Sequence, residues 1–207
     1  MTQGNFAYGS CSGWPELLER YVVPHVSGRP LMALHDQTSI ADAYNKILEA
    51  HVDMEIDALI LLHDDLEVTD PQADEKITAA LELGADLIGI AGGSARGGLA
   101  WWNYEPIGHQ LTDAMNIDFG RRSGNVDLLE GSFLVFSPKA VKELRFDTQF
   151  EGFHGYDEIA MQAHAAKMRV FVVDVDTHHR TPMGFKSEAS HQQWLDADRK
   201  FRKKWNL

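Results

Sequence analysis

The stretch from Asp57 to Asp65 constrains the fold of this chain more than any other. Its five apolar residues, 58–62, run without a polar break and are followed by His63 and two adjacent carboxylates, Asp64 and Asp65. A short apolar run of this kind is typical of a strand buried on both faces of an α/β sheet, where ligands bind at the carboxyl ends of the strands. Two acids held together there repel each other unless a cation or a proton intervenes. The stretch therefore favours a divalent-metal site that holds a diphosphate, with a plain acidic turn as the alternative.

Composition excludes several classes of protein. The 207 residues are 44% hydrophobic and 24% charged, which is ordinary for a soluble globular chain, and we expect one domain over residues 1–207. A formal net charge of −12 argues against a nucleic-acid binder. Cys11 is the only cysteine, so no internal disulfide forms, and no apolar run approaches the ~20 residues that span a bilayer. With no signal peptide at its start, the chain is expected to be cytoplasmic.

Alternating strand and helix patterns predict a parallel, right-handed α/β sheet. A capping-box pattern at Ser39–Asp42 starts a helix, and Asp70–Pro71 starts another that ends at Gly84. A helix from about Gly13 is expected to end at Pro24. The expected strands are residues 5–11, 30–35, the apolar run above, and 86–91.

The second half of the chain is less regular. Residues 92–98 are too glycine-rich for regular structure and are expected to be mobile, and residues 99–125 are interpreted as a long functional loop or lid. Beyond them we expect an apolar segment at 126–136, helices at 138–144, from about 153 to 167 and at 187–205, and a strand at 169–175 that leads into His178 and His179. The last of these helices has an apolar face formed by Trp194, Ala197, Phe201 and Trp205.

Three polar groups fall at predicted strand ends or helix starts: Asp64 with Asp65, Asp157 with Glu158, and His178 with His179. Each has a plain alternative, since Asp157 fits a helix N-cap and the histidines fit a surface or a satisfied core position. The order of the three groups along the chain is a more specific signal of function than any one group alone.

This series resembles the GT-A glycosyltransferases, in particular the inverting family-2 type and, within it, the small soluble branch named after a streptomycin-biosynthesis protein. The similarity runs from about residue 5 to 205. The motifs that carry it are Ser39-Ile40-Ala41-Asp42-Ala43-Tyr44-Asn45, Leu61-Leu62-His63-Asp64-Asp65, Leu129-Glu130-Gly131-Ser132-Phe133-Leu134, Phe146-Asp147, Phe153-His154-Gly155-Tyr156-Asp157-Glu158 and His178-His179.

The resemblance implies a nucleotide-sugar donor over the carboxyl edge of the sheet, a divalent cation (Mn²⁺ or Mg²⁺) and a hydroxyl acceptor, which is a glycan, a lipid-linked sugar or a small molecule. It implies that Asp65 binds the cation, completed by His178 or His179, and that Asp157 is the general base. The positions it implies for donor binding are Ser10, Cys11, Asp36, Asn45 and Asp64, the last beside the ribose or the metal.

Two departures from the family pattern limit how far the family's residue roles can be assigned to this sequence. The usual first Asp of the DXD element is His63 here, so the cation is expected to rest on Asp65 and a C-terminal His. The usual Glu-Asp pair is replaced by Tyr156-Asp157-Glu158, which makes Glu158 the alternative base. Trp101, Trp102 and Glu130 fit either a sugar-binding surface or ordinary packing.

Two other functions remain open from the residues. A nucleotidyltransferase would require a basic, glycine-rich loop after the first strand, and residues 10–14 contain no Lys or Arg. A catalytically silent nucleotide-sugar or glycan-binding module would keep the same donor site without turnover. The basic end of the last helix, residues 199–204, would either touch a membrane surface or complement the helix dipole, and the second is favoured.

Overall fold

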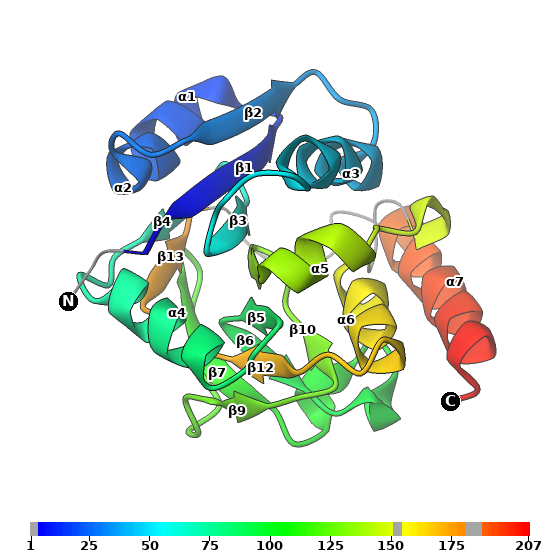
Figure 1. The fold of residues 1–207 in the computed structure, drawn as a ribbon. Coiled ribbons are helices and arrows are strands. Elements are labelled where there is room, and N and C mark those ends of the chain that lie inside the picture. Colours follow the sequence, from blue (N-terminus) through cyan, green and yellow to red (C-terminus); the bar gives the residue numbers. More distant parts are fainter. Residues whose placement is uncertain (1–3, 151–154, 181–187) are drawn as a thin grey trace.

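The computed structural model describes residues 4–150, 155–180 and 188–207. Within these residues the chain forms a seven-stranded sheet with helices on both faces (Figure 1). Five strands run in one direction and β11 and β9 run in the other, so the sheet is mostly parallel, as predicted. Its order is β2 (Leu31–His35), β1 (Phe6–Ser12), β3 (Ala58–Leu62), β11 (Phe133–Phe136), β5 (Leu87–Gly89), β12 (Val170–Val172) and β9 (Gly124–Asn125).

Strand β3 is the buried strand that the apolar run predicted. All five of its side chains are buried, and they alternate between two cores because successive residues of a strand point to opposite faces. Ala58, Ile60 and Leu62 pack toward the π-helical turn (Leu18–Val22) that follows α1 (Pro15–Leu17), and toward α2 (Val23–Val26) and α4 (Ala73–Glu82). Leu59 and Leu61 pack toward α3 (Ile40–His51), α5 (Pro138–Glu143) and α6 (Gly155–Ala165).

Helix α3 begins where the capping box predicted. The Ser39 hydroxyl accepts a hydrogen bond from the Asp42 N–H at 3.0 Å, which satisfies one of the free donors of the first turn. The expected end of the first helix at Pro24 is wrong. A π-helical turn, Leu18–Val22, joins α1 to α2, and Pro24 stands in the first turn of α2, where its missing N–H costs little.

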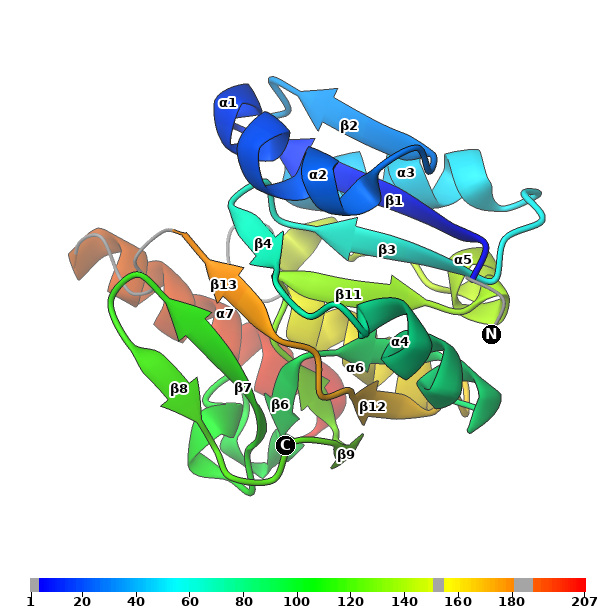
Figure 2. The ribbon, with the colours of Figure 1, turned by 90° about the vertical axis from the view of Figure 1, so that its left-hand side faces the viewer.

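A second sheet lies where the sequence suggested a mobile segment and a lid. Residues 92–125 contain the strands β7 and β8, parts of the second sheet, and two 3₁₀ turns, and the expected strand 86–91 divides into β5 and β6, which belong to different sheets. The second sheet has the order β10 (Leu128–Leu129), β6 (Ala91–Gly93), β7 (Ile107–Thr112), β13 (Thr177–His179) and β4 (Leu66–Val68), with β8 (Asn116–Asp118) paired to β7 (Figure 2).

Close packing of backbones explains the glycines of this sheet. A Cβ atom at Gly92 would lie 2.2 Å from the Leu128 carbonyl oxygen, and one at Gly108 would lie 2.1 Å from that of Ile90. These strands are two to six residues long and carry little alternation, so their pattern was invisible in the sequence.

Helix α7 (Glu188–Trp205) covers the end of the second sheet, beside α6 (Figure 1). Ala197 and Phe201 are buried against Trp101 and Leu128, which confirms the predicted apolar face. Two of its basic residues pair within the chain: Arg202 binds Asp198 and the Gly97 carbonyl, and Arg199 binds Asp196. None of the helices in the described ranges is long and apolar enough to cross a membrane.

We predict that Gly92→Ala destabilises the protein by about 1–3 kcal/mol or more, because the added methyl group meets backbone rather than a movable side chain. Urea unfolding followed by circular dichroism measures the change. Gly13→Ala is the matched control, since a Cβ there meets nothing within 4 Å. Equal free energies of unfolding for both variants would contradict the close approach.

Candidate functional site

Pairing of two short strands joins distant parts of the sequence at the carboxyl end of β3. Three residues after β3, the chain enters β4, which runs antiparallel to β13 with Leu66 opposite His179. The Arg180 N–H also donates to the carbonyl of Asp65 at 2.9 Å. This register places the side chains of Asp65 and His179 together, although they are 114 residues apart.

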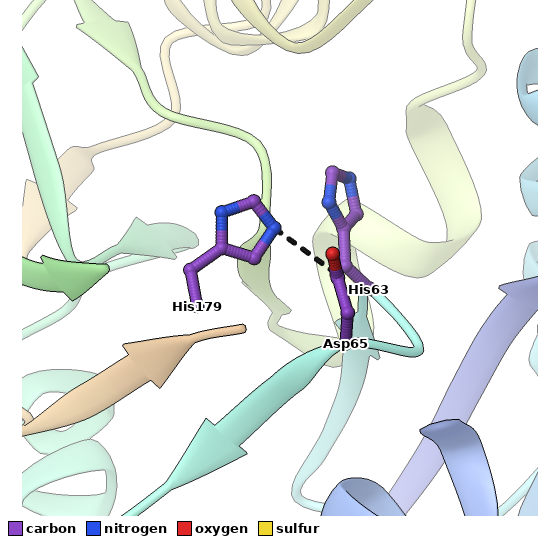
Figure 3. Close-up of side chains that lie close together, drawn as sticks. All are labelled: His63, Asp65 and His179. Atoms are coloured by element: carbon purple, nitrogen blue, oxygen red, sulfur yellow. Dashed lines mark hydrogen bonds and ion pairs between the residues drawn. The ribbon is translucent and has the colours of Figure 1, made fainter. Parts of the chain in front are cut away.

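His63, Asp65 and His179 form a compact cluster (Figure 3). The Asp65 carboxylate and the His179 Nε2 atom are 3.0 Å apart, and the rings of His63 and His179 are 5.6 Å apart. One ligand atom from each residue lies within 4.8 Å of the other two. The Nδ1 atom of His179 is buried and has no hydrogen-bond partner in the described part of the chain. Two imidazoles and one carboxylate at this spacing fit a divalent cation, and His63 is a ligand candidate that the sequence reading set aside.

The two histidines differ in their electrostatics. Burial lowers the pKa of His63 below its ordinary value of 6.5. Burial would also lower the pKa of His179, but the hydrogen bond to Asp65 and the nearby charge of Glu130 outweigh it and raise that pKa above 6.5. Without a cation, the His179–Asp65 pair therefore stabilises the fold fully below pH 6.5. This contribution is lost as the pH rises through the raised pKa of His179.

Tyr156 and Glu130 complete the surroundings of His63. The Tyr156 hydroxyl lies 2.9 Å from His63 Nε2, and burial raises the pKa of that hydroxyl. Glu130 accepts hydrogen bonds from the N–H and hydroxyl of Ser132 at 2.9 and 2.6 Å. Gly131 leaves the room for the tyrosine ring, since a Cβ there would lie 1.9 Å from it. No sequence pattern pointed to this contact.

The two acids at the start of α6, Asp157 and Glu158, have different surroundings. Asp157 is buried in the first turn, next to Tyr156. Glu158 is fully buried and faces α7, where it accepts a hydrogen bond from Lys204 Nζ at 2.6 Å; Gln162 Nε2 on its own helix also donates to it at 2.6 Å. The preceding motif residues, Phe153 and His154, lie outside the described residues.

The two adjacent histidines of β13 also point apart, because side chains alternate along a strand. His178 bonds to Asp113 at 2.8 Å and is not part of the cluster. Of the two metal-ligand candidates, the structure brings only His179 to Asp65.

Apart from Asn45, the residues expected at the donor lie near the ends of three neighbouring strands, β2, β1 and β3. Asp64 is buried and accepts a hydrogen bond from the Trp14 N–H at 2.8 Å, which ties it to the end of β1. Ser10 is buried on β1, and burial together with Asp64 raises the pKa of the half-buried Cys11 thiol. Asp36 is exposed in the turn after β2 with a φ of 54°.

Asn45 is instead part of a backbone clamp. Its Nδ2 group donates to the Phe146 carbonyl at 2.9 Å, and its Oδ1 atom accepts from the Phe146 N–H at 2.7 Å. Both ends of the amide hold the chain after α5 onto α3, so the structure does not support a direct ligand contact. Trp101 is likewise packed in the core against Phe119, whereas Trp102 is partly exposed beside Trp194.

We predict that Asp65→Asn lowers the pKa of His179 in the metal-free protein, because the carboxylate that raises it is lost while burial remains. Titration of the imidazole C–H resonances by NMR measures this. Asp113→Asn is the matched control, because Asp113 pairs with His178 instead. A pKa of His179 that is unchanged in Asp65→Asn would show that the pair does not form.

A second prediction concerns the buried carboxylate of Glu158. Lys204→Ala removes its cationic partner and destabilises the fold by about 1–3 kcal/mol, because a buried acceptor loses its donor. The exposed Lys200→Ala on the same helix is the control and changes stability by less than about 0.5 kcal/mol. Equal thermal unfolding of the two variants would contradict the pairing.

Comparison with known proteins supports the fold and identifies relatives. No protein-family model matches this sequence. The crystal structure of GalNAc-T7 with UDP, GalNAc and Mn²⁺ superposes with a TM-score of 0.63 at 10% identity, over 98% of this chain and 48% of that one. The crystal structure of A197 from STIV superposes with a TM-score of 0.54 at 10% identity, over 88% of this chain and 98% of that one. At such identities the likeness shows the fold, which is the predicted GT-A fold.

A curated relative goes further than the fold. The streptomycin biosynthesis protein StrF of Streptomyces griseus is 30% identical over 190 residues, which cover 86% of this chain and 68% of that protein. This sequence similarity shows that the chain belongs to the family of StrF.

Proposed function

We propose that this protein is a metal-dependent, inverting glycosyltransferase that moves a sugar from a nucleotide-diphosphate donor to a hydroxyl acceptor. The observation that carries the proposal is the cluster of the half-buried His63 with the buried Asp65 and His179 at the carboxyl end of β3. This edge is where open α/β sheets bind their ligands. The GT-A fold and the StrF family support the transferase class.

In this proposal the three clustered side chains hold the cation. When bound, a divalent cation neutralises the charge that builds on the diphosphate as the bond to the sugar breaks. Two imidazole nitrogens and one carboxylate favour Mn²⁺ over Mg²⁺, which prefers an all-oxygen shell. Tyr156, bonded to His63 Nε2, orients that ring.

The nucleoside would lie over the ends of β1 and β2. Asp64, held by the Trp14 N–H, is placed to receive the ribose, and Ser10, Cys11 and Asp36 lie on or after these two strands. Asn45 supports this edge from behind through its clamp on Phe146.

Asp157 is the proposed general base. It shares the first turn of α6 with Tyr156, so it lies next to a residue that contacts the cluster. Glu158 is the weaker candidate, because Lys204 and Gln162 occupy its carboxylate. A base that takes the proton of the acceptor hydroxyl, opposite the diphosphate, would give inversion at the sugar carbon.

We predict that Asp65→Asn and Asp157→Asn separate binding from chemistry. A thermal-shift panel of UDP, GDP, dTDP and their common sugars, with and without Mn²⁺, identifies the donor. A ligand at a hundredfold excess over its dissociation constant stabilises the fold by about 2.7 kcal/mol. This stabilisation is lost in Asp65→Asn and kept in Asp157→Asn. Transfer to a hydroxyl acceptor falls about 10²–10⁴-fold in Asp157→Asn.

Asp113→Asn, an exposed carboxylate outside the cluster, is the control and behaves as wild type. No stabilisation by any nucleotide in the presence of Mn²⁺ would overturn the proposal. Metal-dependent donor binding without turnover on any acceptor would favour a silent binding module, and release of diphosphate from a nucleoside triphosphate would favour a nucleotidyltransferase.

A further inference from the structure

A second group of metal-ligating side chains lies on the other sheet. His109 is on β7, and Asp174 and Asp176 lie in the segment between β12 and β13. The His109 Nε2 atom is 2.7 Å from Asp176 Oδ1, and its Nδ1 atom is 3.6 Å from Asp174 Oδ1. The glycosyltransferase proposal uses none of these residues.

The Nδ1 atom of His109 lacks a suitable partner. The residue is 6% exposed, and its Nδ1 atom is buried without a hydrogen-bond partner in the described ranges. A separation of 3.6 Å from Asp174 is too long for a hydrogen bond. Two ligands that share one cation through bonds of about 2.0–2.2 Å at a tetrahedral angle are separated by roughly 3.4 Å.

The opposite side of the ring has the pattern of a metal-binding histidine. Donation of the Nε2–H to Asp176 fixes the tautomer and leaves a lone pair on Nδ1, directed toward Asp174. Histidines that bind metals usually donate their other ring N–H to a carboxylate or carbonyl in this way.

The carboxylates and the exposure of the group suit a cation. Asp118 lies opposite His109 in the β7–β8 pair and is bound by Arg122 at 2.7 Å. Arg122 is also 3.8 Å from Asp174, so an ion at Asp174 competes with this guanidinium. Lys76 is engaged by Asp70 at 2.6 Å. The side chains of Asp174 and Asp176 are 44% and 62% exposed, so water can reach an ion there and complete its coordination.

We propose that His109 Nδ1 and Asp174 bind a second divalent cation, with Asp176 orienting the histidine. The imidazole ligand selects Zn²⁺, Co²⁺ or Mn²⁺ over Mg²⁺ and Ca²⁺. The ion would join β7 to the segment that enters β13. Because β13 carries His179, this second ion would steady the strand that completes the first cluster.

Co²⁺ binding to the full chain, stripped of metal by a chelator, tests the proposal by equilibrium dialysis and visible absorption. We expect two ions per chain in the wild type and one in the double variant Asp65→Asn/His179→Gln. Adding Asp174→Asn to that double variant removes the remaining ion. Asp176→Asn weakens the binding roughly 10- to 100-fold, since only the orienting contact is lost.

Asp113→Asn, another aspartate paired with a histidine, is the matched control and leaves both ions bound. If the double variant fails to fold, Asp174→Asn in the otherwise wild-type chain replaces it, because Asp174 is on the surface. The number of bound ions then falls from two to one. An ion count per chain that is the same in the wild type, in Asp174→Asn and in His109→Gln would overturn the proposal. An imidazolium held between two carboxylates would give this result.

Discussion

The pairing of β4 with β13 is the interaction on which the candidate site depends. Each strand has only three residues, yet their register sets Leu66 opposite His179 and thereby brings Asp65 to the same place. Strand β13 also pairs with β7, so the second sheet holds His179 from both sides. The first sheet positions His63. This residue directly follows β3, which pairs with β11, and its N–H donates to the Ser132 carbonyl just before β11. The cluster is thus a junction between two sheets rather than a feature of one loop.

The surroundings of that junction are rigid for identifiable reasons. Tyr156 reaches His63 only because Gly131 has no side chain, and Glu158 can be buried only because Lys204 comes to it from the last helix. The residue between these two, Asp157, is therefore fixed from both sides of the first turn of α6. As the proposed base, Asp157 would lose little freedom when an acceptor arrives, which is the physical advantage of a preorganised site.

The two candidate metal-binding groups, His63/Asp65/His179 and His109/Asp174/Asp176, both lie around β13. His179 ends β13, whereas Asp174 and Asp176 precede the same strand, and His109 lies on its neighbour β7. Order at one end of β13 is therefore expected to stabilise order at the other. The sequence from 92 to 125, which looked irregular, provides this support through β6, β7 and β8.

The sequence by itself determined β3, the capped helix α3, the apolar face of α7 and the two acids after β3. These features are local, because they depend on apolar periodicity and a cap within a dozen residues. Tertiary structure decided the rest. It chose His179 over His178, turned Glu158 toward Lys204, engaged Asn45 with Phe146, and added His63 and Tyr156 to the site. It also built a sheet from glycine-rich segments whose strands are too short to show a period. Each of these side-chain contacts joins residues about 46 to 114 positions apart in the sequence, and no local pattern encodes which of two adjacent side chains faces a distant partner.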